Sequence, residues 1–283
     1  MGNTGQGSGN GGGGGTSRAG AQQATANISQ LQALAKKTGA KADQQLADEI
    51  DKIVRTTKIT ENDQDPGDTQ KFFNAIGYTH NKPETVKTEM DLENEINAGN
   101  QSLDYPYYIF HGDRASSASE GKQYADQLHG KRDQYLPSGR LGDGIYFSTS
   151  PSGSAGYMDS RGYGRQTKAI LNHNARVISD SALGTMITKF RRSHPKAYKS
   201  ILNMSGSKGD NWGDDSKKSV FASLFGYNVI ADRDGRKHYD HYLSVIDRKA
   251  LTVVTRKTVT YKDLENAQNN GTNAWKYINN GED

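Results

Sequence analysis

The chain of 283 residues lacks cysteine, lacks long apolar stretches and has little net charge. Without cysteine there are no disulfides, no thiolate metal sites and no cysteine nucleophile. No run of about 18 apolar residues occurs, so we expect a soluble protein without a membrane span. A formal net charge of +4 does not by itself indicate a nucleic-acid-binding protein. An apolar content of 33% is enough for one compact domain.

Residues 1–26 are rich in glycine and small polar residues, which predicts a disordered tail because they offer almost no apolar surface to bury. They show no basic stretch followed by an apolar one, so no secretory signal is expected. Gln6 stands where an N-myristoylation motif requires Ser or Thr, which argues against a lipid anchor.

The next segment predicts helices. Apolar residues recur at helical spacing in two runs of residues 27–57, interrupted at Gly39, as expected for two short amphipathic helices or one broken helix. We assign residues 27–64 to a helical arm and linker. Pro66-Gly67 is the strongest turn signal, so the main domain is placed at about residues 65–265. Residues 266–283 are expected to form a C-terminal tail or short helix.

The main domain combines short strands with a few helices and shows no regular strand–helix alternation. This pattern predicts an α+β fold with an antiparallel sheet. Helices are expected in "DTQKFFNAIGY", "TVKTEMDLENEIN" and "KKSVFASLF". Strands are expected in "DYPYYIFHG", "GIYFSTS", "KAILNHNARVIS", "YNVIAD", "HYLSVI" and "LTVVTRKTVTY".

Three fragments carry the functional signal: "FHGDR" (110–114), "GDGIYF" (142–147) and "SGSAGY" (152–157). Together they resemble the catalytic domain of the ADP-ribosyltransferases, in the diphtheria-toxin and poly(ADP-ribose) polymerase branch. Residues 225–254 and "TQKFFNAIGYTHNKPETV" also resemble parts of such domains carried in bacteriophage virion proteins. The resemblance implies a split antiparallel β-sandwich with flanking helices. It also implies a location in a host cytoplasm or a virion.

The resemblance further implies NAD as co-substrate. Tyr157 would be the main stacking partner of the cationic nicotinamide ring and Tyr146 the second wall, which agrees with the attraction of aromatic faces for flat cations. The backbone of Gly112 and the hydroxyl of Ser154 would bind the nicotinamide amide, and glycine permits that close approach.

By the same resemblance, His111 would bind a ribose hydroxyl of the adenosine half, and Arg114 the diphosphate or adenine side. The family's glutamate on a late strand is missing from "KHYDHYLSVID". Alignment through Asp247 puts Tyr242 near its place, with Asp240 two residues upstream on the same strand face. We therefore expect mono-ADP-ribosylation of a protein, or of a nucleic acid, with His111, Tyr146 and Asp240 as catalytic residues.

Other interpretations stay open. The domain could be a catalytically weak NAD or ADP-ribose reader in a phage structural protein, or an RNA 2′-phosphotransferase, which shares the fold. "KFRRSHPKAYKS" (189–200) has six basic residues, counting His194, and could bind nucleic acid, although a solvated helical surface is commoner. A metal site at His238 and His241 is disfavoured because they would lie on opposite strand faces. The chain has no phosphate-binding GxxxxGK[ST] motif.

Overall fold

The computed structural model describes residues 28–57, 68–78, 81–105, 107–114, 128, 136–155, 164–204, 215, 217–232, 241–254 and 257–258. Helices and strands are both present, so the predicted α+β class is confirmed. A helix over residues 28–35 precedes α2. The other helices are α2 (Ala40–Thr56), α3 (Asp68–Ala75), α4 (Glu89–Asn97), α6 (Pro151–Ala155), α7 (Asp180–Ser193), α8 (Pro195–Leu202), α9 (Lys218–Phe225) and the 3₁₀ helix η3 (Arg248–Ala250).

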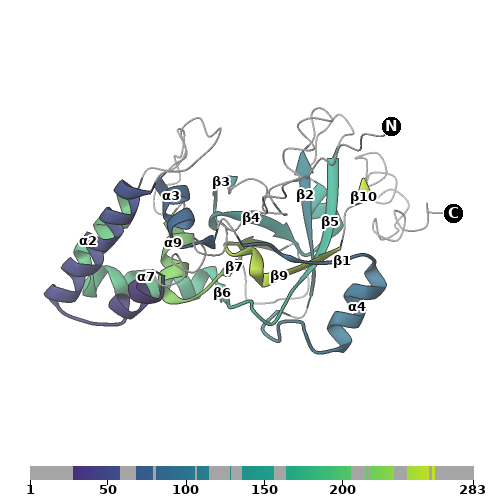
Figure 1. Ribbon diagram of the computed structural model, residues 1–283, viewed down its shortest axis with the longest axis horizontal. Helices are drawn as coiled ribbons and strands as arrows, with labels where there is room; N and C mark the ends of the chain where they lie inside the picture. Colours follow the sequence, from purple (N-terminus) through teal and green to yellow (C-terminus); the bar gives the residue numbers. More distant parts are fainter. Residues whose placement is uncertain are drawn as a thin grey trace, which may run out of the picture.

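The strands form one curled, mixed sheet in the order β1-β9-β5-β2-β4-β8-β7-β6, with β10 beside β5 and β3 beside β4 (Figure 1). Most neighbours are antiparallel, as predicted, but β1/β9 and β6/β7 run parallel. The sheet is therefore mixed rather than purely antiparallel. Its strands are β1 (Glu84–Val86), β2 (Tyr108–Arg114), β3 (Leu136–Gly139), β4 (Gly142–Ser148), β5 (Gly164–Leu171), β6 (Val177–Ser179), β7 (Val229–Ala231), β8 (Tyr242–Val245), β9 (Leu251–Val254) and β10 (Lys257–Thr258).

Helices gather at both ends of the sheet. Figure 1 shows α2, α7 and α9 together beyond β6 and β7, and α4 at the opposite end near β1. Leu31, Leu46 and Ile50 belong to the same hydrophobic core as Phe221 and Val245, so the N-terminal helices are built onto the sheet-bearing part. Gly39 separates the first two helices, with a left-handed φ of 107°. None of the described helices is both long and apolar enough to cross a bilayer.

Two predicted elements are divided in the structure. The strand predicted over residues 168–179 becomes β5 and β6, because Asn172 turns the chain by accepting the backbone N–H of Asn174 at its side-chain oxygen, 2.9 Å away. The helix predicted over residues 85–97 begins only at Glu89. Thr88 and Asp91 form a reciprocal capping box there, while the residues before them pair with β9 as strand β1.

Candidate functional site

Strands β2 and β4 meet at one position and then separate. Phe110 lies opposite Ser148, and no further register pair joins these two strands along their described residues. β2 continues along β5 as far as Arg114, while β4 stays paired with β8 from Ser148 back to Ile145. The sheet therefore opens between the later half of β2 and the earlier half of β4. Most of the predicted site residues lie around this opening, which we call the β2–β4 opening.

His111 bridges the β2–β4 opening. Its Nδ1 lies 2.6 Å from the backbone oxygen of Tyr146, and its ring lies against that of Phe147 with 5.2 Å between centroids. A carbonyl oxygen only accepts hydrogen bonds, so Nδ1 carries the proton and donates it. In the neutral imidazole, Nε2 is then an acceptor. The "FHG" and "GIYF" motifs are thus joined directly, although His111 itself is only 2% exposed.

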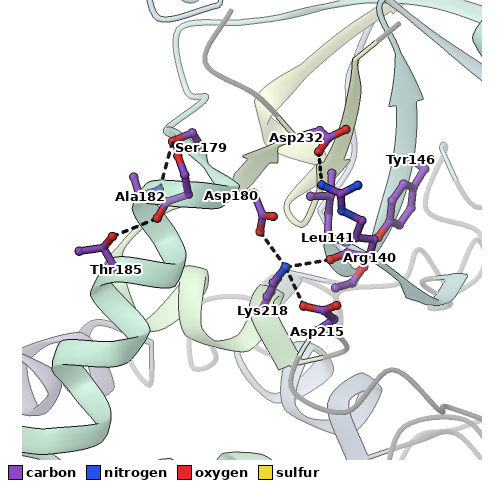
Figure 2. Close-up of polar contacts among 12 residues, drawn as sticks. Arg140, Leu141, Tyr146, Ser179, Asp180, Ala182, Thr185, Asp215, Lys218 and Asp232 are labelled. Carbon is purple, nitrogen blue, oxygen red and sulfur yellow. Dashed lines mark hydrogen bonds and ion pairs between the residues drawn. The ribbon is translucent and has the colours of Figure 1, made fainter.

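The turn before β4 fixes the ring of Tyr146 at its hydroxyl end (Figure 2). This hydroxyl donates to the backbone oxygen of Gly142 at 2.7 Å and accepts the N–H of Leu141 at 3.0 Å. Gly142 has a left-handed φ of 86°, and a Cβ there would lie 2.6 Å from the backbone nitrogen of Ser219. Since its hydroxyl is used as donor and as acceptor, Tyr146 presents mainly a ring face to any ligand.

Lys218, at the start of α9, clamps the same turn. Its Nζ donates to the backbone oxygen of Arg140 at 3.1 Å, and pairs with Asp180 at 2.8 Å and Asp215 at 2.7 Å (Figure 2). Burial lowers the pKa of the Lys218 ammonium, but hydrogen bonds with the two carboxylates outweigh burial, so the pKa lies above its usual value. The charged ammonium thus ties α7 and α9 to the turn that holds Tyr146.

Ser154 lies on α6, which packs against β2, β4 and β5. Its hydroxyl donates to the backbone oxygen of Pro151 at 2.8 Å and accepts from Nε2 of Gln166 at 2.5 Å. The same Nε2 also donates to the oxygen of Pro151 at 2.8 Å. Gln166 is fully buried, and its Oε1 has no hydrogen-bond partner among the described residues. Ser154 therefore retains one lone pair, next to an unpaired amide oxygen.

The serines between β4 and α6 shape the turn that positions Ser154. The hydroxyl of Ser148 accepts the N–H of Ser150 at 3.2 Å, and the hydroxyl of Ser150 accepts the N–H of Gly153 at 2.9 Å. Gly153 allows the close approach, because a Cβ there would lie 2.2 Å from the hydroxyl oxygen of Ser148. The hydroxyl cluster is therefore a structural support for the site.

Two register pairs flank the β2–β4 opening. Gly112 lies opposite Gln166 on β5, and Tyr146 lies opposite Ser244 on β8. Gly112 and Tyr146 are each two residues from the Phe110–Ser148 pair, on the two sides of the β2–β4 opening. Because side chains alternate faces along a strand and opposite residues share a face, Gly112, Gln166 and Tyr146 belong to the same face of the sheet.

Strand β8 carries no carboxylate. Tyr242, at the aligned place of the family's glutamate, lies opposite Ser148 and on the same face as Tyr146. Ser244 lies directly opposite Tyr146, and its hydroxyl is buried without a partner among the described residues. The side chains of β8 that share the face of Tyr146 therefore bear hydroxyl groups and no carboxylate.

The structure tests only part of the predicted site. Tyr157, Asp240 and His238 lie outside the described residues, so the stacking pair of tyrosines and the predicted acid stay predictions. Arg114 lies on β2 opposite Gly164, and the placement of its side chain is not described. The other four predicted NAD-contacting residues lie on β2, β4 and α6 around the β2–β4 opening.

Sequence reasoning missed two residues that support the site. Gln166 is 12 positions from Ser154, and only the register of β5 against β2 reveals that it lies opposite Gly112. Lys218 contacts the oxygen of Arg140 across 78 positions. Neither residue belongs to a local motif, so spacing along the chain gave no signal for either.

Comparison of the chain with models of protein families, with curated proteins and with solved structures finds no match.

Proposed function

We propose that the protein is an NAD-dependent mono-ADP-ribosyltransferase that moves ADP-ribose to a protein acceptor and releases nicotinamide. The observation that carries this proposal is the hydrogen bond from Nδ1 of His111 to the backbone oxygen of Tyr146. It joins two of the motifs that resemble ADP-ribosyltransferases at the place where the sheet opens. The curled α+β sheet is compatible with the split sandwich that the resemblance implies.

The sheet face that carries Gly112, Gln166 and Tyr146 suits a planar ring that bears a carboxamide. Stacking and cation–π attraction with the Tyr146 ring would contribute on the order of 0.5–2 kcal/mol, and Tyr157 is the second wall in this proposal. A carboxamide NH₂ group has two protons to donate. One lone pair of Ser154 and the unpartnered Oε1 of Gln166 provide two acceptors. Pairing that oxygen with a ligand would remove an unpaired-acceptor penalty of about 1–3 kcal/mol.

The tautomer of His111 supports the proposed contact with ribose. Because Nδ1 donates to the Tyr146 carbonyl, Nε2 of the neutral ring is an acceptor for a ribose hydroxyl. The same bond fixes the orientation of the ring, so little side-chain freedom is lost when the ligand binds.

The proposed reaction breaks the bond between the anomeric carbon of the ribose and the nicotinamide nitrogen. Its electron pair leaves with nicotinamide, and the acceptor nucleophile bonds the anomeric carbon and loses its proton. Asp240 is the proposed stabiliser of the positive charge that develops on the ribose. Since β8 presents Ser244 and Tyr242 on the face of Tyr146, a missing electrostatic contact would slow transfer by about 10²–10³-fold. Slow transfer favours single additions over chain elongation.

A second candidate is a binding module that holds NAD or ADP-ribose without turnover. The specific observation in its favour is that β8 presents Ser244 and Tyr242, and no carboxylate, on the face of Tyr146. The two functions make different predictions for nicotinamide, which only the enzyme releases.

The deciding experiment incubates the full chain with NAD labelled in the nicotinamide ring and, separately, in the adenylate. A transferase releases labelled nicotinamide and attaches the adenylate label to protein. A binding module gives a calorimetric signal for NAD and no release. Absence of both would reject both proposed functions.

Paired variants connect the result to the β2–β4 opening. His111→Asn places an amide N–H where Nδ1 stands, so it keeps a donor for the Tyr146 carbonyl and loses the Nε2 acceptor. We expect a lower melting temperature, because the buried ring contact with Phe147 is lost, and NAD affinity about 10-fold weaker in the folded protein, from one lost hydrogen bond. His173→Asn, on an exposed turn, is the matched control. Wild-type NAD affinity in both His111→Asn and Tyr157→Ala would show that the ligand binds elsewhere.

A further inference from the structure

Eight exposed basic side chains lie on segments that meet near the start of α2 and the junction of α7 and α8. They come from two segments about 150 residues apart in the chain, and we call them the basic surface. The first segment supplies Lys36, Lys37 and Lys41; the second supplies Lys189, Arg191, Arg192, Lys196 and Lys199.

Specific contacts hold the two segments together. Nε2 of His194 donates to the backbone oxygen of Lys37 at 2.7 Å. The carboxylate of Asp43 on α2 caps α8 by accepting the backbone N–H of Lys196 at 3.1 Å and of Ala197 at 2.9 Å. Nζ of Lys196 also donates to the side-chain oxygen of Gln44 at 2.6 Å. The basic surface is therefore a fixed feature of the fold.

The charge of the basic surface is not neutralised by ion pairs. Residues 181–209 contain no Asp or Glu. Asp43 is only 3% exposed and its oxygens are engaged by the start of α8. None of the eight side chains forms an ion pair with a described residue. Three of the eight lie in the last turns of α7 and α8, where cations complement the helix dipole, but that role does not explain the other five.

The aromatic residues of this segment serve the core. Phe190 stacks on His194 with 4.6 Å between ring centroids, and Tyr198 stacks on Phe221 at 5.6 Å. Single-stranded nucleic acids are usually bound by exposed aromatic rings that stack on bases. A surface with cations and no such rings is suited to the regularly spaced phosphates of a duplex. It would bind the duplex without sequence preference.

We propose that the basic surface binds the phosphate backbone of duplex nucleic acid. In Figure 1, α2 and α7 lie at one end of the molecule and β2 and β5 toward the other, so this surface is separate from the β2–β4 opening. The proposal does not rest on NAD chemistry, and the failure of either one leaves the other standing. Bound duplex would hold the protein on a polyanion while the opening stays accessible.

Fluorescence anisotropy with the full chain tests this proposal. The probes are labelled duplex DNA and duplex RNA of about 30 base pairs and a single strand of equal length, titrated at about 50 to 200 mM KCl. The patch variant carries Lys37→Gln, Lys189→Gln and Arg192→Gln. The control variant removes the same charge elsewhere, through Lys52→Gln, Arg55→Gln and Lys82→Gln, all exposed in the wild type. Thermal melting checks that both variants fold.

We expect the protein to bind both duplexes more tightly than the single strand. The patch variant should bind duplex at least about 10-fold more weakly at low salt, with a log–log salt slope smaller by about 3, near 0.9 per lost phosphate contact. The control variant should change affinity by less than about 2-fold. Equal effects of the two variants, no duplex binding at the lowest salt, or preference for the single strand would overturn the proposal. So would a patch variant that loses binding to phosphatidylserine vesicles and keeps duplex binding.

Discussion

Replacing Gly153 by alanine tests whether the close approach of α6 to β4 holds the proposed amide-binding residues in place. A Cβ at this position would lie 2.2 Å from the hydroxyl oxygen of Ser148, 3.0 Å from its Cβ and 3.2 Å from the hydroxyl oxygen of Ser150. Ser148 lies on a paired strand and is only 1% exposed. It has little room to move, so α6 has to shift away from the sheet.

The expected destabilisation follows from this crowding. The closest contact is more than about 1 Å inside ordinary van der Waals distance, and overpacking of this kind costs about 1–3 kcal/mol. Alanine recovers about 0.5–1 kcal/mol of that through lower backbone entropy of the unfolded chain. We expect a net loss of about 1–2 kcal/mol, which lowers the melting temperature by about 2–8 °C for a domain of this size. NAD binding should weaken as well, since Ser154 moves with the helix.

The same substitution elsewhere in the chain is the control. Gly184 lies inside α7, and nothing lies within 4 Å of a Cβ built there. Gly184→Ala should therefore raise stability by about 0.5–1 kcal/mol. Combining Ser148→Ala with Gly153→Ala removes the closest contact and should restore part of the loss. Urea unfolding and calorimetric NAD titration measure both quantities. A Gly153→Ala protein as stable as Gly184→Ala, with unchanged NAD affinity, would refute the steric explanation.

Three further predictions concern buried polar groups. Gln166→Met removes the donor to Ser154 and to the oxygen of Pro151. The free energy of unfolding in urea should fall by about 1–3 kcal/mol, and calorimetry should show weaker NAD binding. Unchanged values would contradict the positioning role of Gln166. Lys218→Met leaves the carboxylates of Asp180 and Asp215 without their shared cation. At about 2 kcal/mol for this clamp, the melting temperature should fall by about 4–8 °C, and by less in high salt. An unchanged melting temperature would contradict this. Burial raises the pKa of Asp247 above its usual 3.8, although hydrogen bonds from Lys249 and Asn81 act in the opposite direction. The folded protein therefore binds this proton more tightly than the unfolded chain. Its stability should fall as the pH rises from about 4 through the pKa of the folded state. Asp247→Asn cannot titrate and should not show that fall. The difference in free energy of unfolding, variant minus wild type, should therefore be larger at pH 7 than at pH 4. A smaller difference at pH 7 would contradict the raised pKa of Asp247.

Elements governed by local periodicity and local turn chemistry could be predicted from the sequence. The two N-terminal helices and their break at Gly39 follow from apolar spacing and from one residue with positive φ. The start of α4 could also have been found, because Thr88 and Asp91 form a capping box that the residue pattern shows. The strand predicted over residues 168–179 is divided by a turn at Asn172, which no glycine or proline marks in the sequence.

Long-range pairing could not be predicted. β1 has three residues and pairs in parallel with β9, which lies 168 positions away. Nothing in so short a segment specifies its partner, since β-structure depends more on packing context than on intrinsic preference. The whole basic surface could not be predicted for the same reason. The sequence indicated only its second segment, within residues 189–200. Contacts such as the His194–Lys37 hydrogen bond bring the other three lysines beside it.

The motif residues differ in how far they inform on function. Gly142 and Gly153 are required by close approaches to Ser219 and Ser148, so a protein with this fold needs them whether or not it binds NAD. Folding makes no comparable use of the unpaired oxygen of Gln166, because a buried acceptor without a partner reduces stability. The carboxamide of the proposed ligand would pair with this oxygen, which lies on β5 opposite Gly112. Gln166 therefore separates the proposed NAD site from a merely structural turn more sharply than the glycines that led to it.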